Sequence, residues 1–268
     1  KTHLGKFDDA LARALCWTAI WDMHRDAEIS SADFIEIALS GLAGEGDDAI
    51  VSTVLMQLST SVEAYSKEAN RNTYREKLAD GLWALAQNSK PGSDLQLLFS
   101  RAFALSAQTE AQTAHIRALF NGSAPGLKVD TDLRWYFLIA LTERGATTKA
   151  ELDAELAGDK TTAGSLAFET CLAAMPTSDA KAYAFNKVLN EEIATSVRSA
   201  LIAGFQRPIQ GALLEPFVHL YFDNLISVWE SNSYDPAAKF VTGFYPSWVV
   251  KQSTVDLTNT WLEGAGKD

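Results

Sequence analysis

Residues 51–65 read VSTVLMQLSTSVEAY, and the spacing of their apolar side chains decides the fold class. Apolar residues recur at every third or fourth position, which is the spacing of one buried face of an α-helix. The residues that carry this pattern are Val51, Val54, Leu55, Leu58, Val62 and Tyr65. We therefore predict a helix in this segment, with this face turned toward the core.

The same helical spacing recurs along the rest of the chain. One further stripe consists of Tyr74, Leu78, Leu82 and Leu85, and a longer one of Leu213, Phe217, Leu220, Tyr221, Leu225 and Val228. No run of alternating apolar and polar residues is convincing enough to indicate a strand. The chain is therefore predicted to be all-α.

Residues that begin and end helices support this prediction. Segments 30–33, 109–112 and 148–151 each begin with serine or threonine and carry an acid or amide three positions later, which is typical of helix starts. Glycines stand where helices are expected to end, namely Gly41, Gly122, Gly145, Gly158 and Gly204. Pro91-Gly92 and Pro125-Gly126 mark the clearest loops. These signals predict roughly a dozen or more helices joined by short connections.

So many short helices do not fit around one four-helix core. They favour antiparallel pairs stacked side by side, as in helical-repeat proteins. Because no strict repeat sequence is present, we predict an irregular HEAT-like superhelix of stacked antiparallel helix pairs. Residues 121–130 form the best internal boundary, but we predict a single domain over residues 1–268.

Composition limits the partners that this chain can bind. The 268 residues contain 23 Lys and Arg against 34 Asp and Glu, so the formal net charge is −11. This charge repels phosphate backbones and anionic lipid surfaces, and no apolar run approaches the roughly 20 residues that span a bilayer. We therefore expect neither nucleic acid nor membrane as a partner. Cys16 and Cys171 lie in apolar helical patterns, which indicates reduced core thiols and a cytoplasmic location.

Motifs for catalysis and metal binding are absent. A zinc peptidase needs H-E-x-x-H, which places two imidazoles on one helix face beside a glutamate base. The histidines are His3, His24, His115 and His219, none is followed by glutamate, and no two are close in sequence. The chain also lacks a G-x-S-x-G nucleophile turn and both glycine-rich phosphate-binding patterns. We therefore predict no catalytic residue and no metal ligand here.

Acidic clusters do not form a magnesium site that would support isoprenoid chemistry. The pairs 8–9 and 47–48 are aspartates without the further acid that completes an aspartate-rich motif. Asp223, Asn224 and Ser227 begin like the second such motif, but Glu230 falls one position short of the glutamate it needs.

Most aromatic residues are expected in the core. Trp17 and Trp21 lie one turn apart on the first helix, and residues 135–137 read WYF within a strongly apolar helix. The alternative is that Arg134 together with Trp135 presents a cation to a cavity.

Several short motifs follow one another in order along nearly the whole chain. They are LARALCW at 11–17, WDM at 21–23, RDAE at 25–28, DLRW at 132–135, GFQRP at 204–208, YF at 221–222 and GFYPSW at 243–248. Their order and rough spacing resemble the C-terminal domain of bacterial aminopeptidase N of the monomeric gluzincin type. No single motif is diagnostic, but the ordered set is fairly specific.

The resemblance implies that this chain is a fragment of a larger zinc aminopeptidase that removes amino-terminal residues from peptides. In that family, zinc belongs to a separate thermolysin-like catalytic domain, which is missing here. The helical domain is then expected to cap the catalytic domain, to enclose a substrate cavity and to be inert alone. Its expected partners are the catalytic domain of the same polypeptide and peptide substrates. The start at Lys1 and the tail after Gly264 fit a fragment trimmed at both ends.

The segment 204–208 has two interpretations. In the first, Gly204 caps a helix, Phe205 packs into the core and Pro208 stops the helix from continuing. In the second, Gln206 and Arg207 lie on the cavity wall, where a guanidinium binds a peptide carboxylate. The predicted cavity-wall residues are thus Arg134, Trp135, Gln206 and Arg207.

Two other classes of function stay open at this point. The chain could be a free-standing helical-repeat adaptor that binds protein partners, or a helical enzyme of another class. An H-E-x-x-H motif upstream in the parent gene distinguishes the aminopeptidase from the adaptor.

Overall fold

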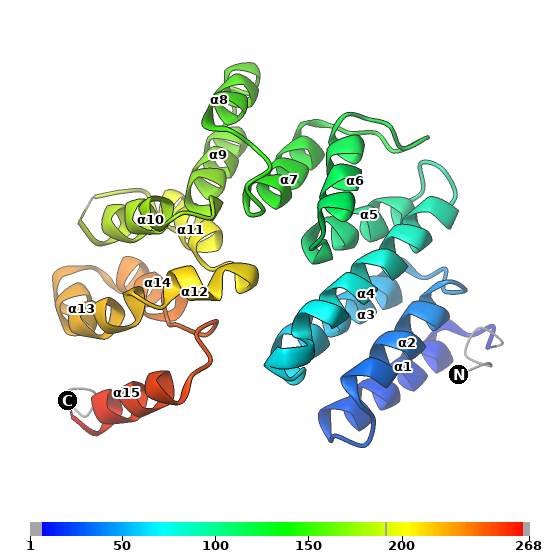
Figure 1. The fold of residues 1–268 in the computed structure, drawn as a ribbon, viewed down its shortest axis with the longest axis horizontal. Helices are drawn as coiled ribbons and strands as arrows, with labels where there is room; N and C mark the ends of the chain where they lie inside the picture. Colours follow the sequence, from blue (N-terminus) through cyan, green and yellow to red (C-terminus); the bar gives the residue numbers. More distant parts are fainter. Residues whose placement is uncertain (1–6, 191, 265–268) are drawn as a thin grey trace. The chain divides into compact units, whose positions relative to one another are not determined.

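The computed structural model describes residues 7–190 and 192–264. The start at Lys1, His3 and the tail at 265–268 lie outside the described residues. Every regular segment of the described ranges is helical, which confirms the all-α prediction (Figure 1). The α-helices are α1 (Ala10–Arg25), α2 (Ser31–Leu42), α3 (Asp48–Thr60), α4 (Glu68–Asn88), α5 (Asp94–Ser106), α6 (Glu110–Phe120), α7 (Thr131–Thr142), α8 (Lys149–Gly158), α9 (Thr162–Ala174), α10 (Ser178–Asn190), α11 (Thr195–Phe205), α12 (Gly211–Leu214), α13 (Phe217–Ser231), α14 (Tyr234–Gly243) and α15 (Gln252–Glu263).

Contacts within the chain divide it into two compact units, Lys1–Phe137 and Leu138–Asp268. The division falls inside α7, a few residues after the loop at 121–130 that the sequence marked as the best boundary. The HEAT-like superhelix and the single domain over residues 1–268 stay predictions.

The core of the first unit contains the face predicted from residues 51–65. Val51, Val54 and Leu58 are fully buried on α3, and Val62 is buried on the π-helix η2 (Ser61–Tyr65) that continues it. Tyr65 is 45% exposed, so the prediction is wrong at this position. The wider π turn changes the angle between successive side chains and thereby takes Tyr65 out of the α-helical stripe.

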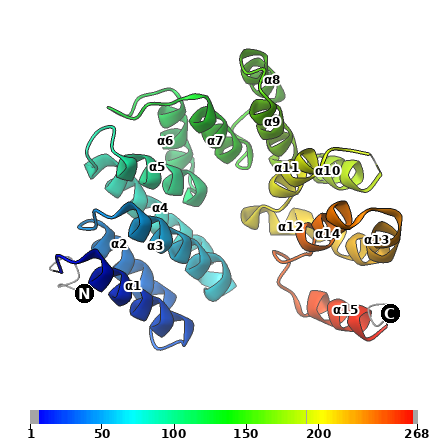
Figure 2. The same cartoon turned by 180° about the vertical axis from the view of Figure 1, so that it is seen from behind.

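Helix α4 packs against α2 and α5 within the first unit (Figures 1 and 2). Leu78 and Leu82 of the second predicted stripe are buried in this packing. Gly81 permits a close approach to α2, because a Cβ at this position would lie 2.4 Å from a methyl carbon of Leu39.

The predicted helix starts are confirmed. Ser30, Thr109 and Thr148 each accept a hydrogen bond from the backbone N–H three residues later, at 3.1, 3.2 and 3.2 Å. Gly122 and Gly145 follow α6 and α7 with φ values of 75° and 70°, the left-handed conformation that favours glycine at a helix end.

Two glycines predicted to end helices lie inside them instead. Gly41 belongs to α2 and Gly204 to α11, and neither has a positive φ. At Gly41 a Cβ would lie 2.5 Å from the ring of Trp17, so glycine is needed there for helix packing. Gly158 is the last residue of α8.

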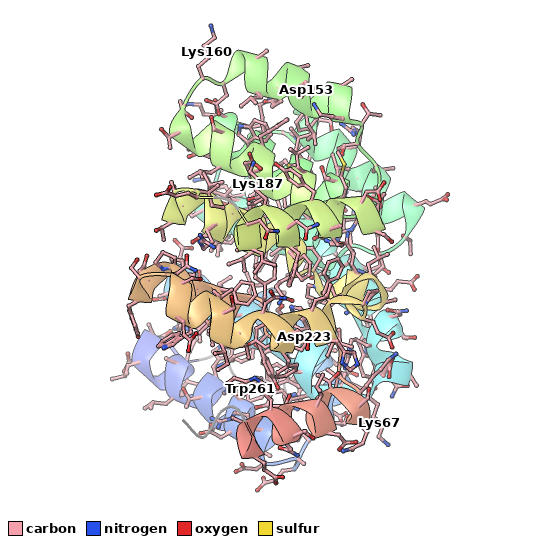
Figure 3. All side chains as sticks on the ribbon, turned by 90° about the vertical axis from the view of Figure 1, so that its left-hand side faces the viewer. Lys67, Asp153, Lys160, Lys187, Asp223 and Trp261 are labelled. Carbon is pink, nitrogen blue, oxygen red and sulfur yellow. The ribbon has the colours of Figure 1, made fainter. Side chains whose placement is uncertain are left out.

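The second unit is built around a cluster of aromatic side chains. Phe185 on α10, Phe205 on α11, and Phe240 and Phe244 at α14 pack edge-on or tilted, with ring centroids 4.8–6.2 Å apart. Trp261 on α15 packs against the margin of this core (Figure 3).

The long stripe predicted from Leu213 to Val228 is divided between two helices. The short α12 ends at Leu214, Pro216 follows, and α13 begins at Phe217. Leu220 is 43% exposed, so the prediction is wrong at this position, whereas Val228 is buried as predicted. Proline breaks the helix because it lacks the N–H that would continue the hydrogen-bond ladder.

The two cysteines are free thiols. Cys171 is fully buried on α9, and burial raises the pKa of its thiol to about 12. Cys16 is half-buried on α1 and thus less enclosed than predicted.

None of the helices in the described ranges is both long and apolar enough to cross a membrane.

Candidate functional site

The second unit contains a polar cluster, which we call the buried polar cluster and define as Glu143, Lys181, Gln206, Arg207 and Gln210. Gln206 and Arg207 are half-buried, and the other three residues are buried. It lies where the end of α7, the ends of α9 and α11, and the start of α10 meet the 3-10 helix η3 (Pro208–Gln210). Two of its members, Gln206 and Arg207, are predicted cavity-wall residues.

Lys181 is the most deeply buried member of the cluster. Its side chain is fully enclosed, and Nζ donates to the carbonyl oxygen of Ala173 at 2.8 Å. It also donates to the carbonyl oxygens of Gly204 at 3.1 Å and Phe205 at 3.2 Å. These acceptors are the last carbonyls of α9 and α11, where the helix dipoles carry partial negative charge. Lys181 therefore joins the C-terminal ends of two helices.

The environment of Lys181 lowers the pKa of its ammonium group to about 7. Burial is the largest cause, since it disfavours the charged form, and the nearby positive charge of Arg207 acts in the same direction. The carboxylate of Glu143 opposes both effects. Because three buried carbonyl oxygens surround Nζ, the amine is used for structure and is not exposed to a reactant.

Glu143 connects the two arginines of this region. It is 5% exposed, its Oε2 lies 3.3 Å from Arg207 Nε, and its Oε1 accepts from Arg144 Nη1 at 2.5 Å. Oε1 thus accepts a hydrogen bond, whereas Oε2 makes an ion pair with Arg207, whose Nε donates no hydrogen bond. The Nη atoms of Arg207 have no partner among the described residues.

The two glutamines fix the chain between α11 and α12. Gln206 Nε2 donates to the carbonyl oxygens of Gly243 and Tyr245, at 2.8 and 3.0 Å. Gln210 Nε2 donates to the carbonyl oxygens of Glu143 and Ala174, both at 2.8 Å. The segment that contains Gln206 and Arg207 is thus held by three neighbouring elements.

Gly204 has a structural role that differs from the predicted cap. It lies within α11, and a Cβ there would be 2.2 Å from the carbonyl oxygen of Thr170 and 2.7 Å from Cβ of Ala173. Glycine therefore allows α9 and α11 to touch, and Gln206 is the residue that caps α11. Phe205 is 2% exposed, which confirms its predicted place in the core, and Pro208 begins η3.

Arg134 and Trp135 belong to the first unit, in the N-terminal part of α7. The guanidinium carbon of Arg134 lies 4.2 Å from the centroid of the Phe120 ring, so its flat face covers an aromatic side chain. Trp135 is 4% exposed and is part of the core. The structure thus brings Gln206 and Arg207 into one cluster with Glu143 and places the other pair in a different unit.

Sequence reasoning missed Lys181, Glu143 and Gln210. A signal for Lys181 was present, since it occupies the same helix face as the buried Ala184, Phe185 and Val188, at the helical spacing. A lysine on such a face must find acceptors within the core.

The described residues do not fit a zinc ion. No three of their His, Cys, Asp or Glu side chains are grouped so that they could hold a metal. His24 stacks on Phe34 and His115 on Trp83, at centroid distances of 4.8 and 4.5 Å. These two imidazoles therefore pack as flat rings.

The chain belongs to the family of ERAP1-like C-terminal domains, because a model of this family matches residues 1–268. Among curated proteins it is similar to Aminopeptidase N from Streptomyces lividans, with 38% identity over 266 residues. This match covers 98% of the chain but 31% of the relative, so the chain spans about a third of that protein's length.

Proposed function

We propose that this chain is the helical C-terminal domain of a zinc-dependent aminopeptidase that removes amino-terminal residues from peptides. The observation that supports the proposal is the match to Aminopeptidase N, which covers nearly the whole chain but only 31% of that relative's length. Zinc and the catalytic groups then belong to the rest of the polypeptide, since the described residues here offer no metal site.

The domain's role is to cap the catalytic domain and to enclose the substrate cavity, in the cytoplasm. The buried polar cluster supports this role because it holds the segment with Gln206 and Arg207 in one position without using the Nη atoms of Arg207. A guanidinium held in this way binds a peptide carboxylate with little loss of side-chain entropy. Arg134 and Trp135 are the other proposed wall residues.

The experiment uses the full-length protein with a free peptide and the same peptide acetylated at its amino terminus. Hydrolysis of the free peptide alone, abolished by a chelator and restored by zinc, is the expected result. Equal hydrolysis of both peptides, or activity that chelators leave unchanged, contradicts the proposal.

A further inference from the structure

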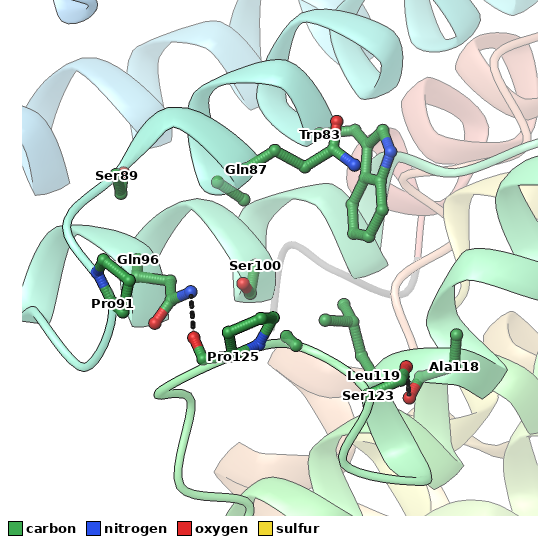
Figure 4. A pocket seen from close by; sticks show the side chains of 12 residues that line it. Trp83, Gln87, Ser89, Pro91, Gln96, Ser100, Ala118, Leu119, Ser123 and Pro125 are labelled. Atoms are coloured by element: carbon green, nitrogen blue, oxygen red, sulfur yellow. Dashed lines mark hydrogen bonds between the residues drawn. The ribbon is translucent and has the colours of Figure 1, made fainter.

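The first unit contains a pocket that plays no part in the proposed function. It has a volume of about 320 Å³ and lies between α4, α5, the end of α6 and the two Pro-Gly loops (Figure 4). This volume is at the lower end of the range typical of small-ligand sites.

Hydrogen bonds within the protein fix the shape of this pocket. Gln96 Oε1 accepts from the N–H of Gly92 at 2.8 Å, and its Nε2 donates to the carbonyl oxygen of Pro125 at 3.0 Å. Gly126 has a φ of 78°, and a Cβ there would lie 2.6 Å from Gly92 N. The two loops therefore touch and are joined by one buried side chain, so the pocket exists before a ligand arrives.

Flat apolar groups form its walls. The indole of Trp83 and the ring of Pro125 lie on different sides of the pocket, and Leu119 also lines it (Figure 4). The indole stacks on His115, with 4.5 Å between ring centroids and 14° between ring planes. This contact holds the indole in one orientation, so a flat ligand meets a fixed surface.

The polar groups of the pocket are few and uncharged. Its lining contains no Asp, Glu, Lys, Arg or His. Ser100 is 1% exposed, its hydroxyl points into the pocket, and this hydroxyl has no partner among the described residues (Figure 4). By contrast, Ser89 and Ser123 donate to backbone carbonyl oxygens. The Ser100 hydroxyl is therefore available to pair with a polar group of a ligand in the pocket.

We propose that this pocket binds a neutral aromatic ring with one hydroxyl or N–H group, such as a phenol or an indole. The ring packs between Trp83 and Pro125, and its polar group pairs with Ser100. A carboxylate or an ammonium is excluded because it would lose water without gaining a charged partner. The ring belongs to a free small molecule or to a side chain of a peptide, because both present the same chemistry.

The test is calorimetric titration of the full-length protein with p-cresol, with toluene and with benzoate. We expect p-cresol to bind, toluene to bind more weakly and benzoate not to bind. Ser100→Ala should weaken the binding of p-cresol about tenfold and leave the binding of toluene unchanged, since it removes one hydrogen bond. Ala124→Phe should fill the pocket and abolish the binding of both p-cresol and toluene. The matched change Ala154→Phe, at an exposed position on α8, should have no effect on binding.

N-acetyl-tyrosinamide distinguishes the two sources of the ring. Binding as tight as that of p-cresol indicates a peptide side chain, and loss of binding indicates a free small molecule. The proposal is overturned if p-cresol does not bind or if benzoate binds as tightly as p-cresol. It is also overturned if the Ser100→Ala and Ala124→Phe variants both bind p-cresol like the unchanged protein, provided that circular dichroism shows the Ala124→Phe variant to be folded.

Discussion

Lys181 shows how one charged residue can hold two helices together. Its ammonium group replaces water at the ends of α9 and α11 with three direct hydrogen bonds. Such a buried group is costly if it loses its acceptors, because the charge then has no compensation. The position of α10 is therefore tied to the positions of both helix ends.

The lowered pKa of Lys181 predicts how stability depends on pH. An unfolded lysine has a pKa of about 10.4, so between pH 7 and 10 the unfolded state binds more protons than the folded state. The free energy of unfolding should therefore rise with pH across this range, and the cost of burying the charge is fully present below pH 7. The three carbonyl acceptors stabilise the charged form in the folded state and thereby reduce this effect. We therefore expect the free energy of unfolding to rise by about 1–3 kcal/mol.

Urea unfolding of Lys181→Met isolates this contribution. The unfolding free energy of the unchanged protein should rise relative to that of the variant from pH 7 to pH 10. Lys160→Met, at an exposed position, is the control. A difference that stays constant with pH would show that Lys181 does not titrate in this range.

Arg207 is predicted to favour the hydrolysis of longer peptides over that of small amino-acid amides. Arg207→Ala in the full-length protein should reduce kcat/KM about ten- to hundredfold for longer peptides and spare a small amino-acid amide, since a charged hydrogen bond contributes about 1.5–3 kcal/mol. Glu143→Gln removes the ion pair but keeps the guanidinium, so it is the matched control. Equal losses in the two variants, or equal effects on both substrates, would make Arg207 a structural residue.

At the scale of elements, the contact between α9 and α11 depends on the absence of a side chain at Gly204. Gly204→Ala improves helix propensity by about 1 kcal/mol. Its Cβ, however, would lie 2.2 Å from the carbonyl oxygen of Thr170, which is rigid backbone. The clash should dominate and destabilise the protein by about 1–3 kcal/mol.

Thermal unfolding followed by circular dichroism measures this effect. Gly158→Ala is the matched control, because a Cβ at the end of α8 meets nothing within 4 Å, and it should be neutral or slightly stabilising. A Gly204→Ala variant as stable as the control would mean that the two helices do not approach so closely.

The sequence was sufficient for those elements whose signals are local. The caps at Ser30, Thr109 and Thr148 depend on residues within one turn, and they were predicted correctly. Gly41 and Gly204 were misread, because a glycine that ends a helix and one that permits helix contact look alike until the neighbouring helix is known. The cluster around Lys181 was missed for the same reason, since its carbonyl acceptors carry no sequence signal.

At the scale of the whole molecule, the family match and the described residues give a consistent picture. The chain covers 31% of its aminopeptidase relative, and its described residues contain no group of metal ligands. Its buried charges instead support helix ends and loops. The proposed role is that this domain shapes access to a catalytic centre in another part of the polypeptide.

The most direct test compares the full-length protein with residues 1–268 alone, in zinc content after dialysis and in hydrolysis of an aminoacyl reporter amide. The full-length protein should retain about one zinc and show chelator-sensitive activity, in accord with a catalytic zinc site. The isolated chain should show a helical circular dichroism spectrum without stoichiometric zinc or activity. Stoichiometric zinc with chelator-sensitive hydrolysis by the isolated chain, or neither property in the full-length protein, would contradict the account.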